Sequence, residues 1–188
     1  MPQYVHYGYS DGSTCASVAL GAGARLEVHS VNGMHVYSES TAALGDFTGS
    51  ATGELTGIHC LLNTIEEAFA EGTIARNDYV LMHTDSEVVW GYIARNIRPS
   101  MAYLSPLVAL VRRRIEYLRT NGLSMDLMWI TRVDNSDADR LARAALRTAL
   151  RTTRQRRATT PTAVFMVDWR LSGAMQDALY HATRAPAF

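Results

Sequence analysis

The amino-acid sequence predicts an α/β protein in which a mixed five-stranded sheet is flanked by helices, with a short C-terminal extension. Segments patterned like strands are interleaved with segments of helical period along the chain. The 188 residues suffice for one domain with a sizeable core, and 47% of them are hydrophobic, as in ordinary globular proteins. No apolar run approaches the roughly 18 residues that a membrane span needs.

The N-terminal part of the chain predicts a meander of three strands. Residues 4–10, YVHYGYS, are rich in aromatic and β-prone residues, and we expect this strand to end in a turn at Asp11, Gly12 and Ser13. Residues 15–31 and 33–41 alternate well enough to form the second and third strands.

The remainder predicts helices alternating with two more strands. Leu55, Ile58, Leu61, Leu62, Ile65 and Phe69 recur at helical spacing, which predicts a helix over 53–71. A continuous apolar run opens 79–86, as in a strand covered on both faces. The other expected elements are helices at 87–94, 106–120 and 136–157, and a strand at 125–131.

The composition changes at ATTPT, after residue 157. We therefore expect residues 1–157 to form one domain and residues 158–188 to form a separate extension. Within the extension, 162–169 has the pattern of a strand and 171–183 that of a short helix. No function follows from this segment.

The net charge of zero hides an asymmetry, and every basic residue is Arg. Residues 1–111 hold 4 Arg against 11 acids, whereas residues 112–157 hold 12 Arg against 5 acids. A partner that carries phosphates could use the basic part, and the acidic part could hold cations. Solvation of helix faces explains the arginines equally well from charge alone.

The N-terminus has no basic-then-apolar run, so we expect no signal peptide and no membrane partner. Cys15 and Cys60 are the only cysteines. They predict reduced thiols in a cytoplasmic protein, with no disulfide framework and no metal knuckle. Protein partners are not predicted.

Three carboxylates occupy unusual places. Glu54 lies within the apolar stripe of the helix predicted at 53–71, where a lone carboxylate is costly unless it is paired or binds a metal. Asp85 ends a buried strand, where ligand sites gather in open α/β sheets. Asp11 ends the first expected strand. Taken singly, each also suits a cap or a turn.

Three more acids, Asp134, Asp137 and Asp139, stand near the start of the last helix. Capping and the helix dipole explain the first two, and Asp137 is expected to point away from the packed face. Asp139 lies between a face of small residues and a stripe of arginines: Arg140, Arg143, Arg147, Arg151 and Arg154. Four acids without a His or Cys cluster suggest an oxygen-ligand site for Mg²⁺ or Mn²⁺.

Four motifs resemble, in order, those of the type 1 ribonuclease H family of the retroviral-integrase-like superfamily, and they span roughly residues 4–150. They are SDGS with Asp11, TGELTGIHCLL with Glu54, HTDSEVVWGYI with Asp85 and RVDNSDADRLARAAL with Asp139. The resemblance implies a ribonuclease H-like fold and hydrolysis of the RNA strand in RNA–DNA hybrids, with two Mg²⁺ (or Mn²⁺) ions.

By this resemblance Asp11 would bridge both ions, and Asp139 would complete the ion that activates the water. Glu54 and Asp85 would complete the ion at the leaving group. These four residues are therefore the expected catalytic and metal-binding residues. The expected nucleic-acid contacts are Ser13, Arg132, Asn135, Arg143, Arg147 and Arg151.

The chain also departs from the family pattern. The Gly/Asn/Pro-rich turn after the first motif is missing, and the loop before the last helix lacks a His and resembles the shorter variant with Arg132 and Asn135. The Lys-rich protrusion of some bacterial members is absent, and RRR stands at 112–114. Two alternatives stay open: a nuclease of this fold that acts on DNA or structured RNA, and a non-catalytic nucleic-acid-binding module. Four intact carboxylates argue against the second.

Overall fold

The computed structural model describes residues 3–15, 18–45 and 49–159. Its strands are β1 (Val5–Cys15), β2 (Ala19–Ser30), β3 (Gly33–Leu44), β4 (Tyr79–Thr84) and β5 (Ser124–Trp129). Its α-helices are α1 (Ser50–Ala70), α2 (Glu87–Ala94), α3 (Ser105–Thr120) and α4 (Ser136–Thr159), and a 3₁₀ turn at Ala102–Leu104 precedes α3.

The five strands form one sheet in the order β3-β2-β1-β4-β5. The β1–β2 and β2–β3 pairs are antiparallel, as in a meander, whereas β1–β4 and β4–β5 are parallel. Helices connect the parallel strands, as such crossovers require. The predicted mixed five-stranded sheet is confirmed.

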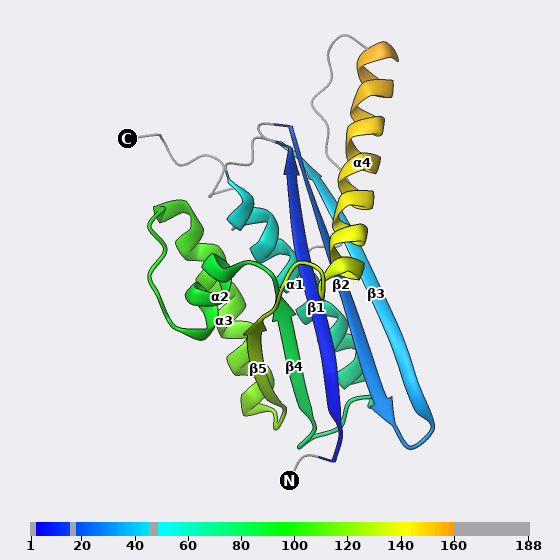
Figure 1. Cartoon of the computed structure of the whole chain (residues 1–188), viewed down its shortest axis with the longest axis vertical. Coiled ribbons are helices and arrows are strands. Elements are labelled where there is room, and N and C mark those ends of the chain that lie inside the picture. Colours follow the sequence, from blue (N-terminus) through cyan, green and yellow to red (C-terminus); the bar gives the residue numbers. More distant parts are fainter. Residues whose placement is uncertain (1–2, 16–17, 46–48, 160–188) are drawn as a thin grey trace.

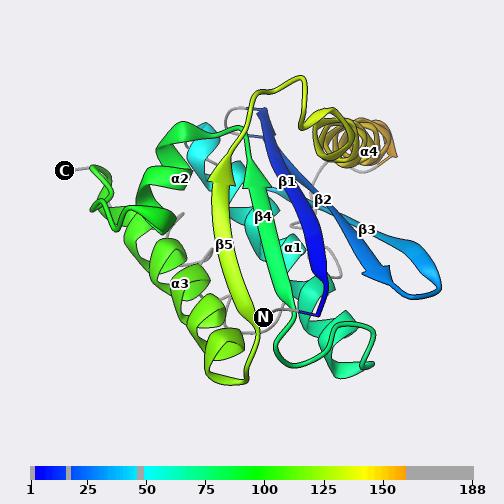
Figure 2. The same ribbon diagram turned by 60° about the horizontal axis from the view of Figure 1, so that its bottom comes forward.

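Helices cover both faces of this sheet (Figures 1 and 2). On one face α1 packs across β1 and β2, with α3 beside it, and α4 packs across β2, β1 and β3 on the other face. The core lies mainly under α1, where five of the six apolar residues at helical spacing are fully buried and Phe69 is partly buried. The five are Leu55, Ile58, Leu61, Leu62 and Ile65, which meet Leu20 and Leu26 of β2 in one apolar cluster.

The turn expected at Asp11, Gly12 and Ser13 is wrong. Strand β1 runs on to Cys15, with Asp11 paired to Gly23 of β2. Gly12 serves close packing here, because a Cβ at this position would lie 1.8 Å from the carbonyl carbon of Gly53 in α1. The glycine therefore lets α1 lie directly on β1 beside Glu54.

The small-residue face predicted for the last helix is confirmed in α4. Ala138 and Ala142 are fully buried against β2. A Cβ on Gly21 would lie 2.3 Å from the carbonyl oxygen of Ala142, and one on Gly23 would lie 2.6 Å from its nitrogen. The glycines of β2 and the alanines of α4 thus allow the helix to approach the sheet closely.

The remaining differences concern the ends of elements. The first helix begins at Ser50, three residues before the expected start, and α4 extends to Thr159. The strand expected at 162–169 and the helix expected at 171–183 lie outside the described residues, so the division into 1–157 and 158–188 stays a prediction. Among the helices in the described ranges, none is both long and apolar enough to cross a membrane. Cys15 and Cys60 are free thiols.

Candidate active site

Three of the four predicted carboxylates meet at one end of the sheet. Asp11 of β1, Glu54 of α1 and Asp85, which follows β4, each offer an oxygen within 4.8 Å of the others. The topology explains the meeting, because β1 pairs with β4 only as far as Ser10 and Thr84. Beyond that pair, the edge of β1 is open toward Asp85, and the close packing at Gly12 brings the start of α1 alongside.

The cluster is partly buried, Asp11 most of all, and is electrostatically unfavourable without cations. Burial raises the pKa of Glu54 to about 9, and the charges of Asp11 and Asp85 add to the effect. Burial likewise raises the pKa of Asp11 to about 7, with added repulsion from Asp85 and Asp139. Within the described ranges, Oδ2 of Asp11 and Oε2 of Glu54 are buried and have no hydrogen-bond partner. Buried oxygens of this kind suit a bound cation.

Asp139, the fourth predicted carboxylate, lies beside this cluster and is not part of it. Its Oδ1 accepts from Arg132 at 2.8 Å and is 3.0 Å from Nε of Arg143, and its side chain is 16% exposed. Its charge still raises the pKa of Asp11, so it lies within electrostatic reach of the site. The structure thus holds Asp139 between two arginines at the margin of the cluster.

Asn135 lies beneath the site. It is 1% exposed, and its Nδ2 donates to Oδ1 of Asp85 at 3.0 Å and to the carbonyl oxygen of Ser10 at 2.8 Å. The buried amide orients Asp85 and ties the start of α4 to β1. The nucleic-acid contact expected for Asn135 stays a prediction. Ser13, another expected contact, is half-buried on β1.

The other two acids of the α4 motif have structural partners. Oδ2 of Asp134 accepts from the hydroxyl of Thr131 at 2.7 Å. Asp137 forms ion pairs with Arg25 of β2 and with Arg140. The side chain of Asp137 is 44% exposed, yet Arg25 extends from β2 to reach it, a contact that the helical wheel does not predict.

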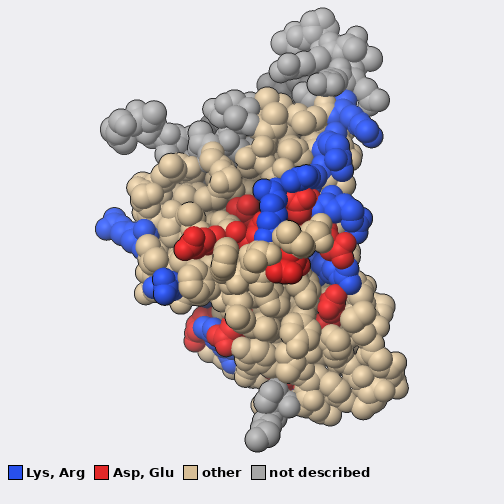
Figure 3. Space-filling view, in the orientation of Figure 1, with Lys and Arg blue, Asp and Glu red and all other residues tan. Residues whose placement is uncertain are grey.

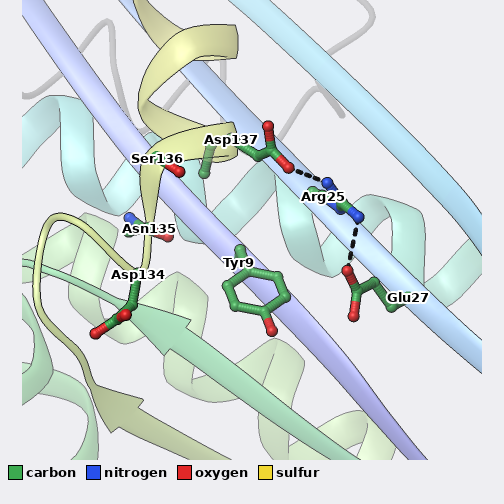
Figure 4. Close-up of a pocket in the computed structure, with 8 residues that line it drawn as sticks. Tyr9, Arg25, Glu27, Asp134, Asn135, Ser136 and Asp137 are labelled. Carbon is green, nitrogen blue, oxygen red and sulfur yellow. Dashed lines mark hydrogen bonds and ion pairs between the residues drawn. The ribbon is translucent and has the colours of Figure 1, made fainter.

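A polar pocket of about 160 Å³ lies beside these groups, on the face of the sheet that α4 covers (Figure 4). Arg25 stands at one side of it, between Asp137 and Glu27, with Nη2 2.7 Å from the Glu27 carboxylate. Tyr9 and Asn135 form other parts of its wall. The lining holds one arginine against three acids, Glu27, Asp134 and Asp137, so the pocket has an excess of negative charge.

The predicted arginine stripe runs along the outer surface of α4. Figure 3 shows basic side chains that pass directly beside the acidic cluster. Where the structure describes the side chains of α4 and the loop before it, the exposed arginines are Arg132, Arg140, Arg143, Arg147 and Arg151. The side chain of Arg154, the last of the predicted stripe, lies outside this described part. Nucleic-acid binding by these residues stays a prediction.

Sequence patterns missed one residue at the site, Trp129. It ends β5, pairs with Thr84 across the parallel ladder and donates its indole N–H to the carbonyl oxygen of Asp85 at 3.1 Å. The available signal was a tryptophan at the end of the strand that lies next to β4, just before Asp85. This signal can be recognised only once β4 and β5 are known to be neighbours.

No protein-family model and no curated protein matches this chain. Solved structures do resemble it. The N-terminal RNase H domain of a Mycobacterium tuberculosis protein matches with a TM-score of 0.61 at 19% identity, covering 80% of this chain and 99% of that domain. LC11-RNase H1, isolated from compost by a metagenomic approach, matches with a TM-score of 0.62 at 18% identity, covering 80% and 99%.

RNase H1 from the halophilic archaeon Halobacterium salinarum matches with a TM-score of 0.55 at 19% identity, covering 77% of this chain and 98% of that one. The described part of the chain therefore has the ribonuclease H-like fold. These likenesses extend over nearly the whole of each solved chain.

Proposed function

We propose that this protein is a ribonuclease H-type endonuclease that hydrolyses the RNA strand of RNA–DNA hybrids with two Mg²⁺ or Mn²⁺ ions. The observation that carries the proposal is the meeting of Asp11, Glu54 and Asp85 at the end of the sheet. The fold supports it, since LC11-RNase H1, of similar structure, has been solved in complex with an RNA/DNA hybrid.

The donor set fits a pair of hard cations. Asp11 and Glu54 each keep one buried oxygen without a partner, and carboxylate oxygens are the ligands that Mg²⁺ and Mn²⁺ prefer. Two such ions, when bound, would activate a water and stabilise the leaving oxygen of a phosphodiester. Asp11 is the most deeply buried of these ligands and lies close to both other carboxylates.

The surrounding residues have distinct roles in this proposal. Asn135 fixes the orientation of Asp85 through its 3.0 Å hydrogen bond. Arg132 and Arg143 hold Asp139 until substrate phosphates bind to the two guanidinium groups, which form strong charge-assisted bonds to phosphate. Asp139 is then free to complete the site at the attacking water. Binding of the substrate and completion of the site are thereby linked.

The exposed arginines of α4 provide the electrostatic part of binding. Arg147 and Arg151 lie on the same exposed side of the helix as Arg143, one and two turns further along it. A duplex whose scissile phosphate lies at the carboxylates could therefore extend along α4. Its phosphates would displace counterions when they meet the arginines.

Cleavage of four substrates of one sequence tests the proposal: an RNA–DNA hybrid, duplex RNA, duplex DNA and single-stranded RNA, each with Mg²⁺ and with Mn²⁺. We expect cleavage of the RNA strand in the hybrid alone, and none in excess chelator or with Asp11→Asn. Cleavage of DNA or duplex RNA would instead support the nuclease of this fold that acts on other substrates. Binding without cleavage of any substrate would instead indicate a non-catalytic nucleic-acid-binding module.

A further inference from the structure

Trp129 presents an indole ring at the rim of the carboxylate cluster. The residue is 46% exposed and stands at the end of β5 beside Thr84, the last residue of β4. Its Nε1 donates to the carbonyl oxygen of Asp85 at 3.1 Å, which fixes the indole next to a proposed metal ligand. A large aromatic side chain is thus held in place at the site while much of its surface faces solvent.

Because of this hydrogen bond, the indole N–H is not available to a binding partner. The indole has a single donor and no acceptor, and the Asp85 carbonyl already uses that donor. The exposed part of Trp129 is therefore apolar. Two further apolar side chains are exposed near the site in sequence: Val88 of α2, three residues after Asp85, and Val133, which is 82% exposed in the loop between β5 and α4.

The surroundings of the carboxylates are thus of two kinds. Arginines on α4 border them on one side (Figure 3). Trp129 borders Asp85 from the β5 side, which is the opposite edge of the sheet from β2 and β3, where α4 packs. A nucleic acid presents the same two chemistries, phosphates along its backbone and the less polar surfaces of its sugars and bases. Aromatic side chains commonly contact these surfaces.

We infer that Trp129 is a substrate-binding residue that packs its indole face against one nucleoside next to the scissile phosphate, on the side away from α4. The inference rests on the proposed function and specifies how that site holds its substrate. The Asp85 carbonyl fixes the ring in advance, so binding the nucleoside requires little ordering of the side chain. In this role Trp129 contributes to affinity and to the position of the cleaved phosphate.

The first test uses the fluorescence of Trp129 itself. The chain has three tryptophans, so Trp90→Phe with Trp169→Phe leaves Trp129 as the only one. In an Asp11→Asn background, which prevents cleavage, hybrid is titrated in Mg²⁺ while a labelled hybrid reports binding by anisotropy. We expect a saturable change in tryptophan emission that follows the anisotropy curve. Unchanged emission over a complete binding curve would overturn the inference.

The second test separates contact with substrate from support of Asp85. Trp129→Phe loses the N–H bond but keeps an aromatic ring, whereas Trp129→Leu loses both. We expect KM for hybrid to rise about tenfold or more in the Leu variant and much less in the Phe variant, as for loss of one aromatic stacking contact. If Trp129 served only to hold the Asp85 carbonyl, both variants would lower kcat alike and leave KM unchanged.

Trp90 supplies a matched control. Its indole N–H also donates to a backbone carbonyl, that of Leu127 at 3.0 Å, but Arg95 lies over its ring at 4.8 Å. Trp90→Leu should therefore leave KM near the parent value even where it lowers the melting temperature. An equal rise in KM for the Trp90 and Trp129 variants would overturn the inference.

Single-stranded and hybrid substrates show which part of the nucleoside is contacted. In a paired duplex the base faces are covered by their neighbours, so a larger emission change with hybrid indicates packing on a sugar, and a larger change with single-stranded RNA indicates stacking on a base. A failure of the parent protein to bind or cleave any substrate would refute the proposed function itself. Normal cleavage by Trp129→Leu with parental KM would refute only the inference about Trp129.

Discussion

Nδ2 of Asn135 and Oδ1 of Asp85 lie 3.0 Å apart, joined by a hydrogen bond that spans the loop before α4 and the end of β4. The same amide nitrogen donates to the carbonyl oxygen of Ser10 on β1. Three separate parts of the chain are thereby fixed at the point where the carboxylates meet. The orientation of one proposed metal ligand depends on a residue that is not itself a ligand.

Asn135→Ala should therefore lower kcat on hybrid by roughly tenfold or more with a smaller change in KM, since Asp85 loses the group that orients it. It should also cost about 1–3 kcal/mol of unfolding free energy, because the buried Ser10 carbonyl loses its partner. Steady-state kinetics and denaturant unfolding measure the two effects. Ser136→Ala, at the exposed neighbouring position, serves as the control. A parental kcat in Asn135→Ala would show that the bond does not matter for the site.

Metal binding should stabilise the fold, because Asp11 and Glu54 hold buried oxygens without partners. In thermal melts, Mg²⁺ in large excess over its Kd should raise the Tm of the parent by several degrees, corresponding to about 2.7 kcal/mol at 100 times Kd. Asp11→Asn should show little of this rise and should melt higher than the parent in chelator, since one repelling charge is gone. Glu71→Gln, exposed at the end of α1, should respond to Mg²⁺ like the parent. Equal Mg²⁺ responses in Asp11→Asn and the parent would count against a metal site at Asp11.

The sequence could predict the three carboxylates because each signal was local. Glu54 was out of place on an apolar helix face, and Asp85 ended an apolar strand. The structure confirms that these two residues meet Asp11. Asp11 was found through its motif although its local structure was predicted wrongly. The dipeptide Asp11–Gly12 suggests a turn. Glycine is instead required at position 12 because α1 packs too closely there for a side chain, which no local pattern reveals.

The roles of Asn135 and Trp129 could not be predicted for a related reason. Asn135 bonds to Ser10, 125 residues away, and Trp129 bonds to Asp85 across the junction of β4 and β5. Such contacts follow from strand order and from the seating of α4, both of which are properties of the assembled sheet. Arg25, which binds Asp137 from β2, is a third example. A helical wheel places a side chain on one side of its helix but does not show what reaches it from elsewhere.

The arginines of α4 should determine the salt dependence of hybrid binding. Replacing Arg143, Arg147 and Arg151 together with Gln should make the slope of log Kd against log salt shallower by about 2–3, since each phosphate contact contributes about 0.9. Anisotropy titrations at several salt concentrations measure the slope.

The control for these arginines removes the same charge elsewhere. Arg95, Arg98 and Arg113 are exposed on other parts of the surface, and their triple Gln variant should keep the parental slope. Because Arg143 also pairs with Asp139, the double variant of Arg147 and Arg151 should be measured as well. If the α4 variants keep the parental slope of log Kd against log salt, these arginines do not contact phosphates and serve only to solvate the helix face.

His59 should make the protein sensitive to acid. Burial, with the nearby Arg114 charge, lowers the pKa of His59 to about 3, and the Arg114 guanidinium lies 2.6 Å from Nδ1. Arg114 is also paired with Glu66 and bonded to Asn63. The folded protein keeps this histidine neutral, whereas the unfolded chain protonates it near pH 6.5. Its contribution to stability is therefore present above about pH 6.5 and is lost as the pH falls toward 3.

His59→Gln should accordingly unfold more easily at pH 7.5 but lose less stability on acidification. Between pH 6.5 and 4.5 the unfolding free energy of the parent should fall more steeply than that of the variant, by on the order of 1 kcal/mol per pH unit. Urea unfolding at several pH values measures both slopes. His35→Gln, on the exposed part of β3, should follow the parent. Parallel curves for the parent and His59→Gln would contradict the proposed linkage.

Asp139 and Asp137 stand two residues apart at the start of α4, and the structure gives them different partners. Asp139 faces the carboxylate cluster and is held by Arg132 and Arg143, whereas Asp137 pairs with Arg25 of β2. Of these two acids, Asp139 is the one whose charge adds to the raised pKa of Asp11, after burial and Asp85. Asp139 therefore lies closer to the proposed metal centre than Asp137 does, a difference that the local sequence alone does not show.

Asp139→Asn should reduce cleavage of hybrid in Mg²⁺ by roughly 100-fold or more, because a metal site at the attacking water would lose a charged ligand. Asp137→Asn weakens the partly exposed ion pairs with Arg25 and Arg140, which should cost about 1 kcal/mol of unfolding free energy, with cleavage near the parental rate. Both variants should be assayed on one hybrid, with thermal melts to check folding. If Asp137→Asn abolishes cleavage while Asp139→Asn cleaves at the parental rate, the assignment of Asp139 to the active site is wrong.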